Sequence, residues 1–230
     1  MATSVRDDRP FTPEATVGPF YPGSFVAAMP QDLWNVSPLV AHHPAGEPIV
    51  LAARFIDAGR RPVPSLIVEF WQANAHGRYR HPLDRSEAPL DPQFDGFARL
   101  RTDDDGTLRF RTIRPGAHPV GVRLKPPFDR AQGGPEPVEG PDATTGRVTR
   151  APHLRLTIFA SGIDRLVTQI FFEGEPLNAS DPVLASIGDP VVADRLIAKS
   201  RTSGGSSPAE YAIDIIMRGE GETPFFDDWA

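Results

Sequence analysis

The sequence predicts an all-β protein, a β-sandwich with long loops and one short helix, and three observations indicate this class. Proline and glycine are abundant, with 26 and 20 residues in a chain of 230, which favours turns and loops over long helices. Short segments rich in β-branched and aromatic residues recur along the chain. Turn signals separate these segments regularly, which is typical of a sandwich of about seven strands.

Four strands are expected in the first half of the chain. Two are strongly apolar, and two alternate apolar and polar residues as a half-buried strand does. Asp-Ala-Gly-Arg at 57–60 is a turn signal between the first two, and Asp-Asp-Asp-Gly at 103–106 predicts a hairpin turn between the last two. The four expected strands cover residues 47–56, 65–72, 96–102 and 107–113.

The second half of the chain predicts three more strands and the helix. The strands are expected at 153–160, 165–172 and 210–218. The helix is expected over 189–199, because Asp189 is a good N-cap residue and proline, here Pro190, suits the first helical position.

A single domain is expected over residues 11–230. The first ten residues are polar and are expected to be disordered. Residues 125–149 are dominated by proline, glycine and polar residues without periodicity, which predicts a loop insertion. The insertion precedes His153 and would border any site there, although an inert surface loop is the simpler interpretation.

Composition excludes several classes of function. The net charge of −6 gives no support to general nucleic-acid binding. No run of about 18 apolar residues is present, so no membrane helix is expected. There is no cysteine, which rules out disulfides and thiolate chemistry and fits a reducing compartment. Residues 1–20 lack the apolar stretch of a signal peptide, so a cytoplasmic location is expected.

One short segment, Ala-Pro-His-Leu-Arg-Leu at 151–156, bears on metal binding. Positions two apart on a strand point to the same face, so His153 and Arg155 are expected to be neighbours. Two histidines at this spacing would offer two imidazoles to one metal ion. A guanidinium is always protonated and has no lone pair to donate, so this face is expected to be a poor metal site.

Four longer motifs occur in a fixed order and together carry far more information than any one of them. Read as a series, they resemble the intradiol ring-cleavage dioxygenases, and the resemblance spans roughly residues 11–228 apart from the insertion. The C-terminal Arg-Gly-Glu-Gly-Glu-Thr-Pro-Phe-Phe-Asp-Asp at 218–228 resembles the end of this family as well. The motifs are WQANxxGxYRH at 71–81, TDxDGxxxFRTIxPG at 102–116, RAPH at 150–153 and TQIFFEGEP at 168–176.

The resemblance implies a site that has lost half of its metal ligands. Catalytic members hold Fe(III) with two tyrosines and two histidines, ligands that suit a hard cation. Carried over by motif, this chain keeps Tyr79 and His153. It has His118 where the second tyrosine belongs and Arg155 where the second histidine belongs. The chain is therefore expected to bind no metal itself.

Two other residues match positions of the family's site. Arg150 stands where catalytic members have an arginine near the substrate, and Gln169 matches a site glutamine. With the ligand set incomplete, both are expected to serve packing and solubility.

The resemblance also implies a partner. Some members are built from two homologous chains, of which only the β chain holds iron. In the α chain an N-terminal segment helps to shape the substrate pocket of the β chain. The matching segment here is 16–20, and its expected substrate-binding residues are Thr16, Gly18, Pro19 and Phe20. A packed proline-rich arm without substrate contact is the alternative for this segment.

The expected function is that of an α subunit in an enzyme that opens the ring of protocatechuate with O₂. Its cofactor, Fe(III), would be bound by the β subunit in a hetero-oligomer. One alternative is a self-sufficient dioxygenase that uses Tyr79, His118 and His153 with water at the fourth position. A second is a non-enzymatic β-sandwich binding module that retains only the fold.

Overall fold

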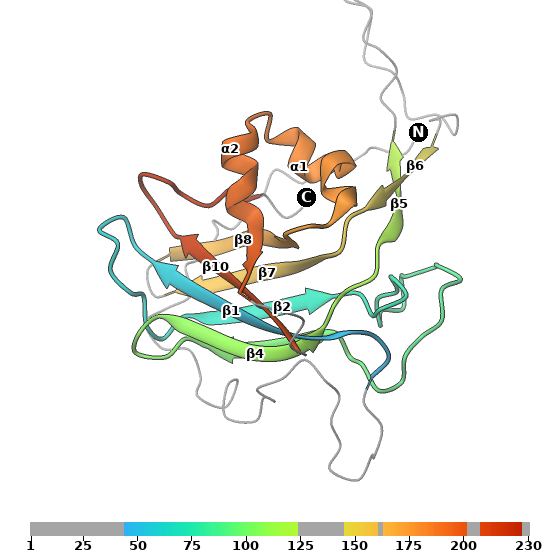
Figure 1. The fold of residues 1–230 in the computed structure, drawn as a ribbon, viewed down its shortest axis with the longest axis horizontal. Helices are drawn as coiled ribbons and strands as arrows, with labels where there is room; N and C mark the ends of the chain where they lie inside the picture. The colour runs from blue at the N-terminus through green and yellow to red at the C-terminus, as the bar shows by residue number, and fades with distance from the viewer. Residues whose placement is uncertain (1–43, 124–144, 161–162, 202–207, 227–230) are drawn as a thin grey trace, which may run out of the picture.

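A computed structural model describes residues 44–123, 145–160, 163–201 and 208–226, and these form a predominantly β structure (Figure 1). Eight strands make one sheet in the order β3-β2-β7-β8-β9-β10-β1-β4. Their bounds are β1 Pro48–Ile56, β2 Ile67–Gln72, β3 Phe97–Arg101, β4 Thr107–Ile113, β7 His153–Ala160, β8 Ile163–Phe172, β9 Ile197–Ser200 and β10 Ala209–Ile216. Strands β5 (His118–Arg123) and β6 (Thr145–Arg150) pair separately and project from the main sheet as a two-stranded ribbon.

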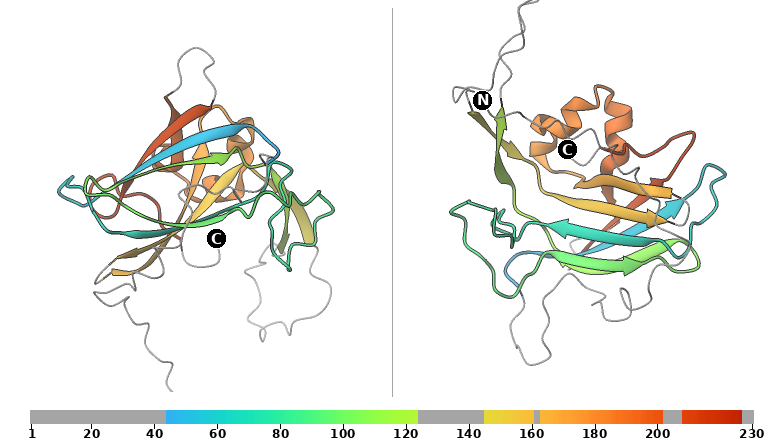
Figure 2. Two further views of the ribbon diagram at one scale, coloured as in Figure 1. Left: turned by 90° about the horizontal axis from the view of Figure 1, so that it is seen from below. Right: turned by 180° about the vertical axis from the view of Figure 1, so that it is seen from behind.

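The long sheet folds over on itself around one hydrophobic core. Five strands separate β2 from β4 in the sheet order, yet the rings of Phe70 and Phe110 lie 4.5 Å apart. The core cluster takes its apolar residues from both halves of the sheet, and Figure 2 shows the curvature from two further sides. The all-β class that the sequence predicts is confirmed.

The turn at residues 103–106 joins the two ends of the sheet. Its backbone closes as a turn, since the Asp103 N–H donates to Thr107 O at 3.0 Å. The strands on either side do not pair with each other as a hairpin, however, because β3 pairs with β2 and β4 pairs with β1. The local turn signal was therefore read correctly, and the pairing inferred from it was wrong.

The predicted helix over 189–199 begins as expected and ends early. Asp189 accepts a hydrogen bond from the Val191 N–H at 2.8 Å, with Pro190 in the first turn. Helix α2 ends at Ala193 and a 3₁₀ turn, η3, covers Asp194–Leu196. The rest of the predicted range is strand β9, which lies between β8 and β10 and so completes the sheet.

Two further short helical elements precede α2. The 3₁₀ helix η2 covers Pro176–Ser180, and α1 covers Pro182–Ser186. Helices α1 and α2 lie together on one side of the sheet (Figure 1). No helix in the described ranges is long and apolar enough to cross a membrane.

The segment predicted as a loop insertion at 125–149 differs from expectation at its C-terminal end. Residues 145–149 belong to β6, which pairs antiparallel with β5 and sets His118 opposite Arg150. This strand forms through backbone pairing and carries little apolar periodicity. Residues 125–144 of the predicted insertion lie outside the described residues, as do Thr16, Gly18, Pro19 and Phe20.

Candidate functional site

The loop that presents Tyr79 is organised by two buried side chains of the Trp-Gln-Ala-Asn motif. Gln72 donates through Nε2 to Ile113 O at 3.0 Å and accepts from the Thr112 hydroxyl at 2.8 Å, which ties β2 to β4. Asn74 accepts through Oδ1 from the backbone N–H groups of His76 (2.9 Å) and Arg78 (3.0 Å). The Asn74 side chain therefore shapes the turn that leads to Tyr79.

A close backbone contact fixes this loop against the segment that leads to His118. Gly77 has φ +76°, and a Cβ at this position would lie 2.0 Å from Ala117 O. The N–H of Gly116 donates to Asn74 O at 2.9 Å. Only glycine permits such an approach together with positive φ. The contact holds Tyr79 and His118 face to edge, with ring centroids 5.1 Å apart at 88°.

Strand β7 carries His153 and Arg155 on one face, as predicted. Leu154, Leu156 and Ile158 face the core and are fully buried or nearly so. On the opposite face Arg155 lies in register with Trp71 of β2 and Gln169 of β8. Neighbours in register share a face of the sheet, so the Arg155 side chain emerges between those two residues.

Six residues, five on different strands and one on a loop, form a closed ring of neighbours, which we call the site ring. Some neighbours are in strand register, some are hydrogen-bonded and some have rings in contact. His153 adjoins this ring, since its imidazole lies 5.2 Å from that of His118 between centroids. Taken in order, the members of the site ring are Tyr79, His118, Arg150, Gln169, Arg155 and Trp71.

Arg150 is held by a buried network. It is 7% exposed, donates through Nε to Asp181 Oδ2 at 2.9 Å, and donates through Nη2 to Gln169 Oε1 at 2.6 Å. Asp181 is fully buried and also accepts from the N–H groups of Ala151 and Val183, each at 2.9 Å. Because Asp181 caps helix α1, this network joins the helical segment to β6, β7 and β8.

Both histidines of the site are neutral at pH 7. Burial, with the positive charge of Arg150, lowers the pKa of His118 to about 4 and that of His153 to about 3. His153 Nδ1 lies 2.7 Å from Ala151 O. A carbonyl oxygen only accepts, so Nδ1 carries the proton of the neutral ring and Nε2 keeps the lone pair.

Tyr79 is a protonated phenol in this environment. Burial raises the pKa of Tyr79 to about 12, while the positive charges of Arg150 and Arg155 offset part of that rise. The Tyr79 ring also packs against Trp71, with centroids 4.8 Å apart. The backbone N–H of Tyr79 donates to Asp84 Oδ2 at 2.7 Å, which anchors the loop.

The side chains in the site that could serve as metal ligands are one phenol and two imidazoles. No group of three or more His, Cys, Asp or Glu side chains arranged to hold a metal ion exists among the described residues. Tyr79, His118 and His153 adjoin one another, but two guanidinium groups, those of Arg150 and Arg155, belong to the same site ring. Guanidinium groups this close to the only candidate donors among the described residues disfavour a multivalent cation at the site.

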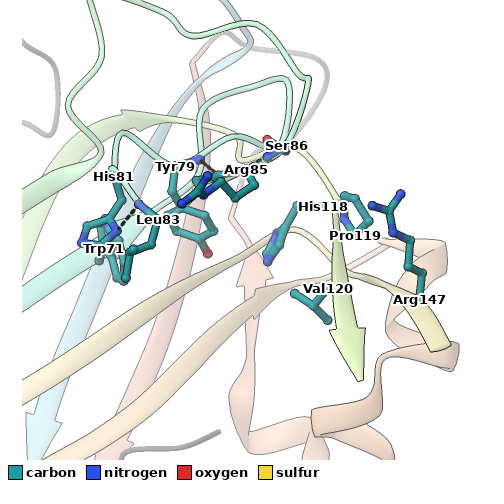
Figure 3. Close-up of a pocket in the computed structure, with 12 residues that line it drawn as sticks. Trp71, Tyr79, His81, Leu83, Arg85, Ser86, His118, Pro119, Val120 and Arg147 are labelled. Atoms are coloured by element: carbon teal, nitrogen blue, oxygen red, sulfur yellow. Dashed lines mark hydrogen bonds between the residues drawn. The ribbon is translucent and has the colours of Figure 1, made fainter. Parts of the chain in front are cut away.

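A pocket of about 640 Å³ opens in front of Tyr79 and His118 (Figure 3). In Figure 3 the Tyr79 ring extends from its loop toward His118, with Trp71 and Leu83 on one side and Val120 and Arg147 on the other. The pocket is lined by Trp71, Gly77, Tyr79, His81, Leu83, Asp84, Arg85, Ser86, His118, Pro119, Val120 and Arg147.

Comparison with known proteins supplies the decisive observation. The profile of the Dioxygenase family matches residues 17–219, which is most of the chain. The chain belongs to the intradiol dioxygenase family.

Two similar members of the intradiol dioxygenase family are chains of one kind of enzyme. The protocatechuate 3,4-dioxygenase alpha chain of Pseudomonas putida is 32% identical over 95% of this chain and 96% of that one. The protocatechuate 3,4-dioxygenase beta chain of Burkholderia cepacia is 40% identical over 79% of this chain and 68% of that one. Similarity to the alpha chain therefore runs nearly end to end, whereas similarity to the beta chain is higher over a shorter stretch.

Solved structures of family members share the fold. An intradiol ring-cleavage dioxygenase from Tetranychus urticae superposes with a TM-score of 0.53 at 17% identity, covering 86% of this chain and 90% of that one. The 3-chlorocatechol 1,2-dioxygenase from Rhodococcus opacus gives a TM-score of 0.52 at 21% identity, covering 75% and 60%. These likenesses establish the β-sandwich architecture that the intradiol dioxygenase resemblance implied.

The structure brings together all six expected site residues that it describes: Tyr79, His118, Arg150, His153, Arg155 and Gln169. Sequence reasoning missed Asp181, whose carboxylate holds Arg150, and the role of Trp71 in the site ring. A signal for Asp181 exists in the sequence, because Asp-Pro at 181–182 repeats the helix-start pattern seen at 189–190.

Proposed function

We propose that this chain is the α-type, non-iron-binding subunit of a protocatechuate 3,4-dioxygenase. With a β-type partner it would convert protocatechuate and O₂ to 3-carboxy-cis,cis-muconate. The observation that carries the proposal is Arg155, a cation that emerges beside Gln169 at the place of a family histidine ligand. Similarity to an alpha chain over 95% of this sequence supports the same assignment.

The donor set of this chain does not fit Fe(III). A ferric site in the family combines two phenolates with two imidazoles, and the phenolates offset much of the metal's charge. Here one phenol remains, with its pKa raised to about 12, and His118 replaces the other. The guanidinium of Arg155 adds positive charge where a neutral lone pair is required. The iron of the complex is therefore assigned to the partner.

The role proposed for this chain is to support the partner and to shape its substrate pocket. The residues proposed for the second task are Thr16, Gly18, Pro19 and Phe20. We assign a structural role to Arg150, Gln169 and Asp181, because their polar atoms are buried and hydrogen-bonded to one another.

Co-expression with a β-type chain tests the proposal. The partner should carry two tyrosines and two histidines at the family's ligand positions. The expected result is a stable complex that cleaves protocatechuate, while this chain purified alone shows no ring cleavage. Ring cleavage by the purified single chain, or failure of the two chains to associate, would refute the assignment.

A self-sufficient dioxygenase is the second candidate, and one observation favours it. The rings of Tyr79, His118 and His153 are consecutive neighbours at 5.1 and 5.2 Å, and His153 keeps a lone pair on Nε2. Three ligands with one open position are a workable catalytic set. This candidate predicts that the chain alone binds iron, and that the iron is lost when His153 is replaced.

A further inference from the structure

Strands β5 and β6 stand apart from the rest of the fold. Within the described residues they pair only with each other, over a register that runs from His118↔Arg150 to Arg123↔Thr145. Each contacts the other far more than any other strand or helix, and the ribbon projects from the main sheet (Figures 1 and 2). A two-stranded ribbon is marginally stable in water unless a further strand or a packed surface supports it. A third strand would therefore stabilise the ribbon.

The two outer edges of the ribbon differ in what they offer to a neighbouring strand. In an antiparallel pair, two residues opposite each other either bond to each other or both turn their backbone N–H and C=O groups outward. Pro119 is opposite Thr149 and has no N–H, so this pair is of the outward kind. The N–H groups of Thr149 and, two residues before it, Arg147 therefore face the outer edge of β6. The β5 edge lacks a donor at Pro119, whereas β6 contains no proline and keeps all of its donors.

The side chains on the two faces of the ribbon indicate which kind of strand would fit. Val120 and Val148 are opposite each other on one face and are half-buried. The other face carries Pro119, Thr149 and Arg147, which are exposed. Neither strand contains Asp or Glu, so the charge of the ribbon is positive although the whole chain carries −6. A strand that matches β6 would therefore alternate apolar residues with Asp or Glu.

One end of β6 is anchored firmly to the fold. The strand ends at Arg150, which donates to the buried carboxylate of Asp181 at 2.9 Å. The next residue, Ala151, donates its N–H to the same carboxylate at 2.9 Å. This end of β6 is therefore fixed before any partner binds, which lowers the cost of ordering the edge on association.

We propose that the outer edge of β6 is a docking surface on which an extended segment of the β-type partner adds a third strand to the ribbon. The segment alternates apolar and acidic residues. Its backbone bonds to β6 provide affinity, and its alternate side chains provide specificity. The identity of the partner rests on the function proposed above, whereas the open edge and its charge belong to this chain.

Hydrogen exchange of the backbone amides of Arg147 and Thr149 tests the proposal. It is measured in the full-length chain alone, at two protein concentrations, and in the complex with a β-type partner. In the chain alone both amides should exchange readily, because they face outward from β6. In the complex they should exchange at least about tenfold more slowly, because each becomes hydrogen-bonded within a three-stranded sheet.

Two variants of the edge, each with a matched control, test the same contact through the dissociation constant of the complex. Thr149→Pro removes an outward N–H without taking a bond from β5 and should weaken the complex at least about tenfold, whereas Thr149→Val keeps the N–H and should bind like the parent. Arg147→Glu reverses the charge and should weaken the complex about tenfold, less so at high salt. Its control is Arg101→Glu on β3, an exposed position at the end of the main sheet, which should bind like the parent.

The outcomes separate this proposal from the proposed function. If the complex forms and cleaves protocatechuate while the two amides still exchange readily, or while Thr149→Pro binds as well as Thr149→Val, the docking surface is wrong and the proposed function stands. If the parent chain forms no complex, the proposed function is refuted and the docking surface with it. Slow exchange in the chain alone would also overturn the proposal. Protection that grows with concentration would assign the edge to a second copy, and protection independent of concentration would assign it to another segment of this chain.

Discussion

The ring of His118 stands at 88° to the ring of Tyr79, with centroids 5.1 Å apart, although the two residues come from different parts of the fold. The Gly77–Ala117 contact fixes this geometry by bringing the two backbones together. We therefore predict that the backbone framework of an intradiol dioxygenase site is retained in this chain and that the change lies in the side chains that it presents.

If the framework is intact, restoring the side chains should restore metal binding. We expect the double variant His118→Tyr/Arg155→His to acquire Fe(III), because it regains a second phenolate and loses a guanidinium from the site ring. Each single variant should bind less iron than the double variant. Metal analysis and the visible absorption of tyrosinate–iron provide the measurement.

Arg109→His is the control for the double variant, since Arg109 pairs with Glu210 on the exposed surface of β4. It should bind no iron. A double variant that folds like the parent and still takes up no iron would show that the framework has also changed.

The Gly77 contact can be tested against a second glycine of similar conformation. Gly77→Ala should destabilise the protein by more than about 3 kcal/mol, because it combines positive φ with a severe clash against Ala117 O. Gly174 has φ +77° but no atom within 4 Å of an added Cβ, so Gly174→Ala should cost about 1 kcal/mol. Urea unfolding measures the loss of unfolding free energy in both variants. Equal losses would show that the contact between Gly77 and Ala117 O does not add to the cost of the substitution.

The buried Arg150–Asp181 pair predicts a large loss of stability when one partner is neutralised. Asp181→Asn leaves the guanidinium of Arg150 buried without its counter-charge and should cost about 3–5 kcal/mol. Asp214→Asn removes the exposed partner of Arg54 and should cost at most about 1 kcal/mol. Thermal or urea unfolding compares them. A small loss for Asp181→Asn would mean that the network contributes little to the fold.

The neutral histidines predict that stability falls on acidification. An ordinary histidine has a pKa near 6.5, whereas those of His118 and His153 are lowered to about 4 and about 3. At pH values between the folded-state pKa and 6.5, each of these histidines binds a proton in the unfolded chain but not in the folded chain. The stabilisation is therefore complete above pH 6.5 and is lost as pH falls toward the folded pKa values, at about 2 kcal/mol per histidine between pH 7 and pH 5.

His153→Gln tests this linkage, since it should reduce the pH 7 to pH 5 loss of unfolding free energy by about 2 kcal/mol. His76, an exposed residue of the Tyr79 loop, gives the matched control His76→Gln, for which the loss should equal that of the parent. An unchanged pH dependence in His153→Gln would show that the imidazole is not held neutral.

Local patterns in the sequence predicted seven of the ten strands in the described residues, missed β5, β6 and β9, and predicted strand pairing poorly. The alternation in β7 placed Leu154 and Leu156 in the core, because a strand buried on one face must alternate. The Asp189–Pro190 cap predicted where α2 begins. It did not reveal that Ile197–Ser200 becomes a strand, since that depends on pairing with β8 and β10. The turn at 103–106 was likewise predicted correctly from local residues, whereas the pairing of its flanking strands with β2 and β1 was not.

The site shows the same division between local and long-range information. The two-residue spacing of His153 and Arg155 predicted their shared face, and motif order identified Tyr79 and His118. The bond from Arg150 to Asp181 spans 31 residues and has no local signal, so the buried network emerged only in three dimensions.

Iron content after replacement of His153 tests the central claim most directly. The complex of this chain with its β-type partner is purified as parent and as His153→Gln in this chain only, and iron is measured per pair of chains. We expect the same iron content and the same visible absorption in both, because the proposed function assigns the metal to the partner. Loss of iron from the variant, together with iron in this chain purified alone, would contradict the account and identify the chain as a metal-binding dioxygenase in its own right.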